Sequence, residues 1–404
     1  MSMAAPSISP EPTEPVGADY SPPVGYHRFH PDTSINFQCN RWFNWIGPDS
    51  YDEIMATAHA AHSYPQWIDA FLALAARARG QNRPLAAAYY DRAAEFFMSP
   101  QDHRKTPARM RFLTAMRESY AIVPERIPYN GGGMSCYDLR PDRPALGDII
   151  VFGGYDSYIE EFLPILTGIV RHGYRVIAFE GPGQGSTLED GGLPSISEWE
   201  QPVSAVLDHY GLDDVTAIGI SLGGGLVIRA AAFEPRIHRV IAYDILDDEL
   251  EVVGRQIGHG TTPLLRLLLT LRARRVVNAL ARVRARRPIA QWGLAQGLHV
   301  TGASDPYDFL AAARSTTTRR ISAAVTADVL LLAGADDHYV PVRQLHRQAR
   351  ALTSARSVTT RLFTAAESAS SHCQIGNLAL VTRTVLAWLA TVDPQHADNS
   401  EAVR

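Results

Sequence analysis

Six short apolar runs constrain the fold of this chain more than any other feature of its sequence. Five are rich in β-branched residues or leucine and one is weaker; in order they read "GDIIVFGG", "GYRVIAFEGPG", "DVTAIGIS", "HRVIAYDI", "ADVLLLAGADD" and "TTRLFTAAE". Helical segments separate them. Continuous apolar runs that alternate with helices are typical of a parallel sheet covered on both faces. The sequence therefore predicts an α/β fold with a mostly parallel sheet and helices on both sides of it.

The carboxyl ends of these runs are where catalytic and ligand-binding groups gather in such a sheet. The residues that fall there are Gly153, Gly154, Tyr155, Glu180, Ser221, Asp244, Asp336, Asp337 and the loop that contains His372. We therefore expect the functional site at this edge of the sheet.

Two helical regions accompany the predicted core. Residues 23–126 carry apolar residues at helical spacing without a strand signal, which predicts an N-terminal helical cap. Residues 247–322 interrupt the strand pattern and predict an inserted helical lid, which divides the core into 127–246 and 323–392. Both regions are long enough to roof a site at the strand ends, and "NRWFNW" and "LLRLLLTL" are candidates for that roof.

The insert contains a strongly basic stretch, "TPLLRLLLTLRARRVVNALARVRARRP", with the pattern of an amphipathic helix. Such a stretch can contact nucleic acid or a membrane. The formal net charge of the chain is −4, however, which favours a solvated arginine face. We accordingly expect neither a nucleic-acid nor a membrane partner, whereas a homodimer stays open.

Several classes of protein are excluded by simple counts. Residues 1–22 lack the basic and apolar regions of a secretory signal and, like the tail 393–404, are expected to be disordered. The chain has three scattered cysteines, too few for a disulfide framework or a zinc cluster, so we expect a cytoplasmic protein without a metal. Lys105 is its only lysine and lies in none of the contexts that a P-loop, a kinase or most Schiff-base enzymes require. No cofactor is expected.

One serine lies in a sharp turn between a predicted strand and a predicted helix. Residues 219–223 read Gly-Ile-Ser-Leu-Gly and match G-x-S-x-G, in which flanking side chains would collide with the strand and the helix. Ser221 is therefore the candidate nucleophile, although an ordinary turn with a capping serine would show the same letters.

A serine hydroxyl needs a general base and a third group that orients the base. In the order Ser…Asp…His, the acid follows a later strand, where the sequence offers Asp336 and Asp337. His372 lies after the weaker run and before the last helix, and it is the predicted base. A surface or core histidine is the alternative interpretation of His372.

Two backbone N–H groups must stabilise the oxyanion that forms when serine attacks a carbonyl. We expect them from Leu222, which follows the nucleophile, and from Tyr155 in the loop after "DIIVF". The glycine-rich "FEGPGQGST" departs from the dinucleotide pattern and shows no helix start. It is interpreted as a loop at the rim of the site.

These residues together resemble the α/β-hydrolase superfamily over about 129–392. The stretches "NRWFNW", "AAAYYDRAAEFF", "GGYDSYIEEF", "FEGPGQGS", "GISLGGG", "YDILDD" and "SHCQIGN" are similar to its helical-cap branch, which contains dihydroxypseudooxynicotine hydrolase and fungal polyketide-shortening hydrolases of pigment biosynthesis. The resemblance implies Ser221 as nucleophile, His372 as base and, from the G-x-x-D spacing, Asp337 rather than Asp336 as the acid.

The resemblance also implies cleavage of a carbon–carbon bond beside a ketone, in a bulky aromatic or polyketide-like small molecule. A carbon leaving group needs stabilisation, for which Asp244 and Asp248 are candidate acids, and Trp42 is a candidate contact in the roof. The same triad would serve an esterase, lactonase or thioesterase. A cyclase or isomerase that uses the cavity without hydrolysis, or a binding module with a retired site, is a further alternative.

Overall fold

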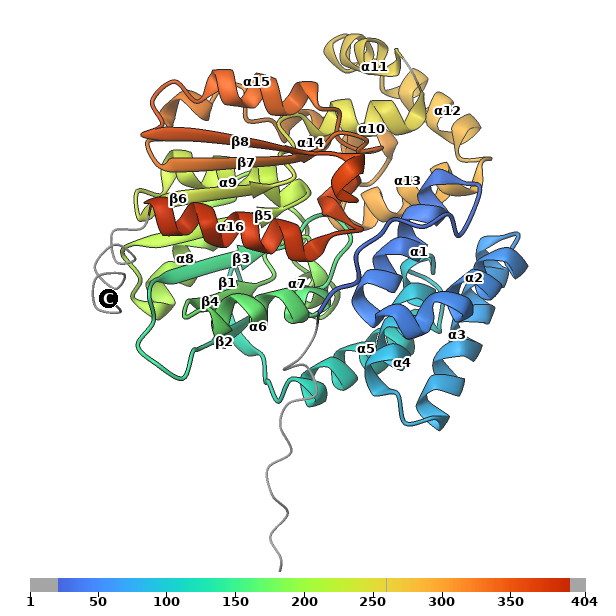
Figure 1. The fold of residues 1–404 in the computed structure, drawn as a ribbon. Helices are drawn as coiled ribbons and strands as arrows, with labels where there is room; N and C mark the ends of the chain where they lie inside the picture. The colour runs from blue at the N-terminus through green and yellow to red at the C-terminus, as the bar shows by residue number, and fades with distance from the viewer. Residues whose placement is uncertain (1–20, 259, 393–404) are drawn as a thin grey trace, which may run out of the picture.

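An eight-stranded sheet forms the centre of the computed structural model, which describes residues 21–258 and 260–392 (Figure 1). The sheet order is β1-β2-β4-β3-β5-β6-β7-β8. The strands are β1 (Glu125–Tyr129), β2 (Gly132–Leu139), β3 (Asp148–Phe152), β4 (Arg175–Phe179), β5 (Val215–Ile220), β6 (Ile237–Tyr243), β7 (Asp328–Gly334) and β8 (Ser357–Phe363). Residues 1–20 of the expected disordered leader and the expected tail 393–404 lie outside the described residues.

Six of the strands coincide with the six apolar runs, and all six are parallel to their sheet neighbours among them. This confirms the predicted α/β fold. The structure adds an antiparallel hairpin, β1 and β2, at one edge of the sheet. Three of the five residues of β1 are exposed, so that strand lacks the continuous apolar run that identifies a buried strand.

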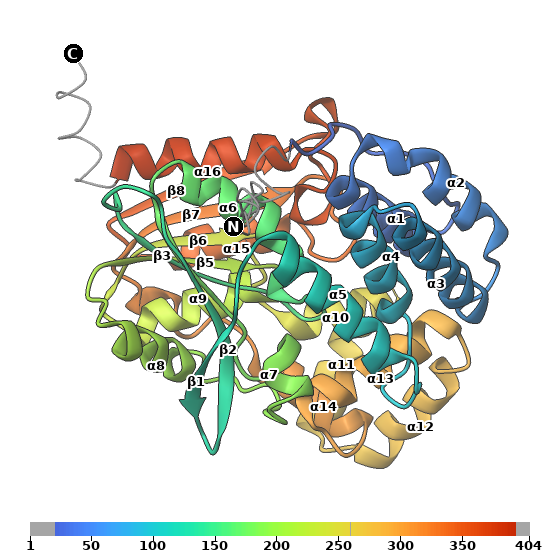
Figure 2. The ribbon, with the colours of Figure 1, turned by 90° about the horizontal axis from the view of Figure 1, so that it is seen from below.

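Helices cover both faces of the sheet (Figure 2). α6 (Leu163–Arg171) and α16 (Leu378–Val392) belong to one hydrophobic core. α8 (Glu200–Tyr210), α9 (Leu222–Phe233) and α15 (Arg343–Ala351) belong to the core on the other face. Alternate residues of each central strand join one core or the other, as the two-residue period of a strand requires.

The N-terminal region consists of helices joined by short turns from Thr33 to Ser119, as its sequence pattern predicts, whereas its last residues begin strand β1 at Glu125. Its helices are α1 (Thr33–Ile46), the 3-10 turn η1 (Pro48–Ser50), α2 (Tyr51–Ala60), α3 (Tyr64–Gly80), α4 (Pro84–Phe96) and α5 (Lys105–Ser119). Pro84 occupies the first turn of α4, where its missing N–H is not needed.

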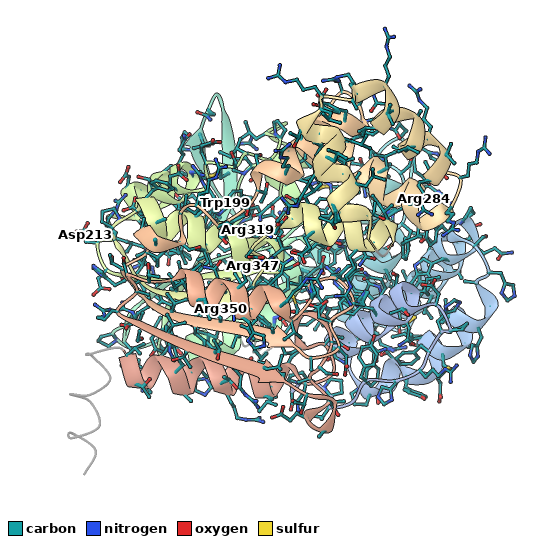
Figure 3. The ribbon with its side chains drawn as sticks, turned by 90° about the horizontal axis from the view of Figure 1, so that it is seen from above. Trp199, Asp213, Arg284, Arg319, Arg347 and Arg350 are labelled. Carbon is teal, nitrogen blue, oxygen red and sulfur yellow. The ribbon has the colours of Figure 1, made fainter. Side chains whose placement is uncertain are left out.

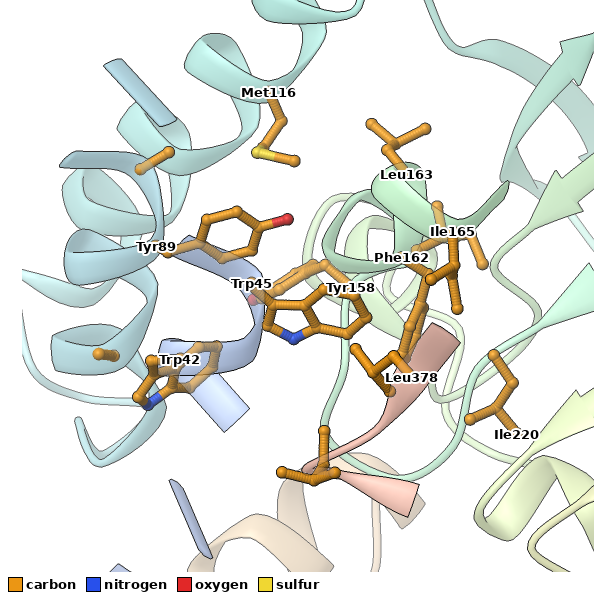
Figure 4. Close-up of a cluster of buried hydrophobic side chains, with 14 of the residues drawn as sticks. Trp42, Trp45, Tyr89, Met116, Tyr158, Phe162, Leu163, Ile165, Ile220 and Leu378 are labelled. Carbon is orange, nitrogen blue, oxygen red and sulfur yellow. The ribbon is translucent and has the colours of Figure 1, made fainter. Parts of the chain in front are cut away.

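These helices share a hydrophobic core with the sheet domain. The close-up in Figure 4 shows Trp45 of α1 between Tyr89 of α4 and Phe162, which lies in the 3-10 turn η2 (Ile159–Phe162) before α6. The rings of Trp45 and Phe162 meet edge to face at 5.9 Å, and the hydroxyl of Tyr89 donates to a backbone carbonyl of η2. The N-terminal helices are therefore built into the core and not appended to it.

A buried chain of ion pairs crosses the same boundary. Glu161 of η2 accepts from Arg41 of α1, at 3.1 Å to Nε, and from Arg92 of α4 at 2.7 Å. Arg92 also pairs with Glu95, which in turn binds Lys105. All five residues are less than one-tenth exposed. Since an unpaired charge at such depth is very costly, this network fixes how the two parts meet.

Five α-helices form the insert between β6 and β7. They are α10 (Glu249–Ile257), α11 (Thr261–Thr270), α12 (Arg274–Arg284), α13 (Pro288–Thr301) and α14 (Pro306–Ser315), followed by the 3-10 turn η3 (Ser322–Ala324). In Figure 1 they lie at the same end of the sheet as the N-terminal helices.

The basic stretch of the insert is two helices, where its sequence pattern suggested one. α11 ends at Thr270 and a turn at residues 271–273 follows, with Arg272 in the left-handed region at φ 52°. The N–H of Ala273 donates to the carbonyl of Leu268, the six-residue closure of a helix end that usually has glycine at the left-handed position. The sequence has no glycine at this break. The helical spacing of apolar residues therefore gave no sign of it.

Within the described residues, no single helix has both the length and the apolar composition of a membrane span. One sharply bent pair, residues 365–374 with α16, meets that criterion by length and composition alone.

Candidate active site

Ser221 lies at the tip of a strained turn between β5 and α9. Its backbone has φ 60° and ψ −117°, a conformation that a serine adopts only where the surroundings enforce it. The Ser221 N–H donates to the carbonyl of Tyr243 at 2.7 Å, which fixes the turn to the end of β6. The side chain thus projects from the carboxyl edge of the sheet, as G-x-S-x-G predicts.

The flanking glycines allow the strand and the helix to approach each other. A Cβ on Gly219 would lie 1.9 Å from the carbonyl oxygen of Gly223, and one on Gly223 would lie 2.5 Å from that of Gly153. Neither distance accommodates a methyl group. The spacing of the motif is therefore a steric requirement of this turn.

His372 and Asp337 complete a chain of hydrogen bonds with Ser221. The Oγ of Ser221 lies 2.9 Å from Nε2 of His372, and Nδ1 of His372 lies 2.6 Å from Oδ2 of Asp337. The other carboxylate oxygen of Asp337 accepts from the N–H groups of Tyr339 and Val340, at 2.7 and 2.9 Å. The acid is held by the backbone and the imidazole is oriented by the acid, which is the arrangement that activates a serine.

The two adjacent aspartates, Asp336 and Asp337, have different surroundings. Asp337 is buried, whereas Asp336 is exposed and engages the base loop only through its backbone N–H. Geometry thus places Asp337, and not Asp336, against His372.

A second carboxylate, that of Asp244, contacts the same imidazole nitrogen. Its Oδ2 lies 3.1 Å from Nδ1 of His372. The same side chain accepts from the N–H of Cys373 and, at 2.9 Å, from Nε2 of Gln374. Asp244 follows β6 with φ 52°, and Cys373 and Gln374 both have φ 49°. Asp244 therefore holds the strained turn that carries the base.

The charges around His372 change its affinity for a proton. Burial by itself would lower the pKa of the imidazole, but the carboxylates, Asp337 foremost, outweigh it and raise the pKa well above its usual value. Burial also raises the pKa of Asp337. Each of the two groups therefore holds a proton more tightly than it would in water.

The loop after β3 lies directly against the serine turn. A Cβ on Gly154 would lie 2.9 Å from Cβ of Ser221 and 3.2 Å from the backbone nitrogen of Leu222. Tyr155 is the next residue along this loop. The two N–H groups that we expect to form an oxyanion site, those of Tyr155 and Leu222, thus come from segments in contact beside Ser221.

The glycine-rich loop after β4 packs against the loop after β3 and stabilises it. The side-chain amide of Gln184 donates to the carbonyls of Gly153 and Gly154, at 2.7 and 3.3 Å. One expectation about this loop is wrong, because a five-residue helix, α7 (Gly185–Glu189), begins in it. The loop does not line the main cavity, but it lines a smaller pocket that shares Tyr155, Leu222 and Glu249 with that cavity.

A cavity of about 490 Å³ lies over Ser221 and His372. Most of its lining is apolar. The lining comes from α1, from the insert and from the sheet domain, which contributes Ser221 and His372. α1 contributes Phe37 and Trp45, and the insert contributes residues such as Trp292 of α13. The volume is that of a site for a drug-sized molecule.

Three expected substrate contacts do not line this cavity. Asp244 faces His372 from behind, and Asp248 caps α10 and pairs with Arg266 and Arg319. Trp42 is completely buried against Phe96. Of "NRWFNW", Arg41 and Trp45 reach the cavity, whereas no residue of "LLRLLLTL" does.

Asp32 and Asp156 line the cavity, and so does Glu249, an acid that sequence reasoning missed. Glu249 is the first residue of α10, only 8% exposed, and it borders the cavity together with Tyr155 and Leu222. Burial raises the pKa of its carboxyl to about 7, so that a large fraction of it is protonated at neutral pH. Its position right after two other acids offered no signal that distinguished it from them.

One group of side chains within the described residues has the spacing of a metal site. Asp244, His372 and Cys373 offer ligand atoms that all lie within 4.8 Å of one another. However, both ring nitrogens of His372 already contact other side chains, and burial raises the pKa of the Cys373 thiol, which disfavours a thiolate ligand. The donor set fits the orientation of an imidazole better than a metal.

A hydrogen-bonded Ser-His-Asp chain at the carboxyl edge of a mostly parallel sheet is the arrangement of a serine hydrolase. A family model described as an alpha/beta hydrolase family matches residues 151–373, more than half of the chain. The chain belongs to the alpha/beta hydrolase family, which confirms the resemblance drawn from its motifs.

The chain has curated relatives in fungi. The chain is 30% identical over 260 residues to hydrolase LUC6 of a Fusarium species, a match that covers 54% of this chain and 62% of LUC6. It is 28% identical over 343 residues to the 20-hydroxy-prefusarin hydrolase FUS2 of Gibberella moniliformis, covering 76% of this chain and 79% of FUS2. The chain therefore spans less than two thirds of the length of LUC6.

Solved structures extend the likeness beyond the sheet. The crystal structure of the 2,6-dihydroxy-pseudo-oxynicotine hydrolase is similar with a TM-score of 0.62 and 18% identity, over 88% of this chain and 95% of that one. AbyA5 is similar with a TM-score of 0.63 and 17% identity, over 88% and 93%. A coverage of 88% is too large for the sheet alone, so the shared fold includes helical regions around it.

Proposed function

We propose that this protein is a serine hydrolase that cleaves a carbon–carbon bond beside a ketone, in a bulky and largely apolar small molecule. The observation that carries the proposal is the hydrogen-bonded chain of Ser221, His372 and Asp337 at the floor of a cavity of about 490 Å³. The names of the relatives, one of them specified for 20-hydroxy-prefusarin, agree with a hydrolase.

The first half of the reaction forms an acyl-enzyme. The Oγ of Ser221 attacks the ketone carbonyl while Nε2 of His372 takes its proton. The N–H groups of Tyr155 and Leu222 stabilise the oxyanion. The carbon–carbon bond then breaks, its electron pair leaves with the departing carbon as an enolate, and the proton on His372 passes to that fragment.

The second half releases the acyl group. Water enters, His372 removes a proton from it, and the resulting hydroxide attacks the acyl carbon. The bond to Oγ breaks and Ser221 takes back the proton. The products are a carboxylic acid and the protonated carbon fragment, so one water is consumed in each turnover.

The position of Glu249 favours cleavage of a carbon–carbon bond over cleavage of an ester. An alkoxide leaving group needs only the proton from His372, whereas an enolate also needs its oxygen stabilised while the bond breaks. A carboxyl with a pKa of about 7 beside Tyr155 can donate a hydrogen bond to that oxygen at neutral pH. We assign Glu249 the role that the sequence had suggested for Asp244 or Asp248.

The experiment offers the purified protein a panel of β-diketones and acyl-phenols in H₂¹⁸O, together with p-nitrophenyl esters, lactones and thioesters. We expect carboxylic acid labelled with one ¹⁸O from a diketone or acyl-phenol. Glu249→Leu should lower that turnover about 10²-fold and leave p-nitrophenyl acetate hydrolysis nearly unchanged. Turnover of esters or thioesters alone would contradict carbon–carbon cleavage, and an isomeric product without ¹⁸O would indicate a cyclase or isomerase.

A further inference from the structure

The first helix of the basic hairpin in the insert has two apolar stripes, and only one of them faces the protein. Leu265 and Leu269 of α11 are buried in the small core of the insert. Leu264, Leu267 and Leu271 are 48%, 54% and 66% exposed. Their spacing places these three leucines on one side of the helix. A surface helix normally carries polar residues there.

The second helix repeats the pattern. Val277 of α12 is buried, whereas Val276, Leu280 and Val283 are exposed and spaced for one side of the helix. α11 and α12 are consecutive and pack against each other. Six exposed aliphatic side chains on one hairpin are more than the scattered apolar residues of an ordinary surface, and such a set marks an interaction site.

The charge of this hairpin has one sign. Residues 261–287 contain eight arginines and no Asp or Glu. Arg266 and Arg274 pair with acids of neighbouring segments. The other six are exposed: Arg272, Arg275, Arg282, Arg284, Arg286 and Arg287. This concentration of positive charge stands on a chain whose formal net charge is −4.

The hairpin lies at the mouth of the cavity. Ala281, Arg284 and Ala285 line the cavity, as does Ile289 at the start of α13, and both Arg284 and Ile289 are exposed. In Figure 3 the hairpin forms an outer edge of the molecule, with Arg284 near the N-terminal helices. The exposed surface of the hairpin therefore adjoins the entrance of the cavity.

We propose that the exposed face of α11 and α12 docks on an anionic lipid surface and lets the cavity take up an apolar substrate there. Aliphatic side chains enter the headgroup region while arginines bind the anionic lipids, a combination that characterises interfacial helices. A second copy of this chain fits poorly, because a two-fold pairing of the hairpin would bring its arginines together. The proposal revises the expectation of a solvated arginine face.

The test is sedimentation of the full chain with vesicles of phosphatidylcholine, with and without 30 mol% phosphatidylglycerol. We expect binding to the anionic vesicles that weakens steeply with salt and no binding to the neutral ones. The triple variants Arg275→Gln/Arg282→Gln/Arg286→Gln and Leu267→Gln/Leu271→Gln/Leu280→Gln should each lower partitioning at least tenfold. None of these six residues lines the cavity, so turnover of a soluble ester should not change.

The control removes the same charge elsewhere, with Arg77→Gln, Arg171→Gln and Arg350→Gln, all exposed. This variant should bind anionic vesicles as the unchanged protein does. Equal binding to neutral vesicles, no binding to anionic ones, or an equal loss in the control would overturn the proposal. A dimer in analytical ultracentrifugation that dissociates in either hairpin variant would assign the surface to a second copy instead.

Discussion

At the scale of single residues, two carboxylates share one imidazole nitrogen, and they are not equivalent. Asp337 makes the shorter contact and is fixed by two N–H groups, which suits the acid that orients the base. Asp337→Asn should lower kcat on the order of 10⁴-fold, because the imidazole then favours the wrong tautomer. The matched control is Asp336→Asn at the exposed neighbour, with near-normal turnover expected. The reverse ranking would move the acid to Asp336.

Asp244 should influence how kcat/KM depends on pH. The base must be neutral, so kcat/KM falls as the pH drops through the pKa of His372, and nearby carboxylates raise that pKa. Asp244→Asn removes one of these charges and should move the acid limb of the profile to lower pH, with kcat lowered about tenfold. Profiles of the two proteins in the same buffers check this. An unchanged limb would limit Asp244 to holding the loop.

The sequence predicts the residues of the Ser-His-Asp chain better than the residues that line the cavity. Ser221 and His372 stand in motifs whose neighbours are sterically or topologically required. The residues themselves left Asp336 and Asp337 open and only the resemblance favoured Asp337, because burial and the contact with His372 separate them and two adjacent letters do not encode either. Glu249 follows two acids in a row, and which of the three reaches the cavity depends on where α10 begins. That start is set by Asp248, whose side chain caps the helix and so cannot face the substrate.

At the scale of elements, the serine turn depends on how closely β5 and α9 approach. Gly219→Ala would place a methyl group 1.9 Å from the carbonyl of Gly223, so the turn must open. We expect loss of nearly all turnover and a lower melting temperature. Gly80→Ala is the control, since a Cβ at Gly80 meets no atom within 4 Å. A Gly219→Ala protein with normal activity would show that the turn is not sterically tight.

The existence of elements is read from the sequence more easily than their ends and roles. The buried parallel strands were predictable because short, continuous apolar runs between helical segments suit a strand that is covered on both faces. The break between α11 and α12 was not, since Arg272 takes a conformation that sequence patterns reserve for glycine. The leucines of α11 were expected over the substrate because helical spacing cannot tell a stripe that faces a cavity from one that faces outward.

At the scale of the whole molecule, the N-terminal helices are fixed to the sheet domain through Glu161. Its carboxylate is fully buried between Arg41 and Arg92. Glu161→Gln would leave two buried guanidinium groups short of a counter-charge and should cost roughly 3–5 kcal/mol of unfolding free energy. Urea unfolding at neutral pH measures this.

The control for this loss is an ion pair at the surface of the same helices. Asp69, whose side chain is 69% exposed, pairs with Arg104, and Asp69→Asn should cost about 1 kcal/mol or less. If the two substitutions cost the same, the buried network does not fix the helices to the sheet domain.

The most direct test of the catalytic serine is the intact mass of the protein after treatment with a fluorophosphonate, which phosphonylates an activated serine. We expect the protein to gain one phosphonyl group, located at Ser221 by peptide mapping, and Ser221→Ala to gain none. His372→Ala should react far more slowly, since Oγ then has no base at 2.9 Å. Equal labelling of the Ser221→Ala protein, or none of the unchanged protein, would contradict the assignment of Ser221 as the nucleophile.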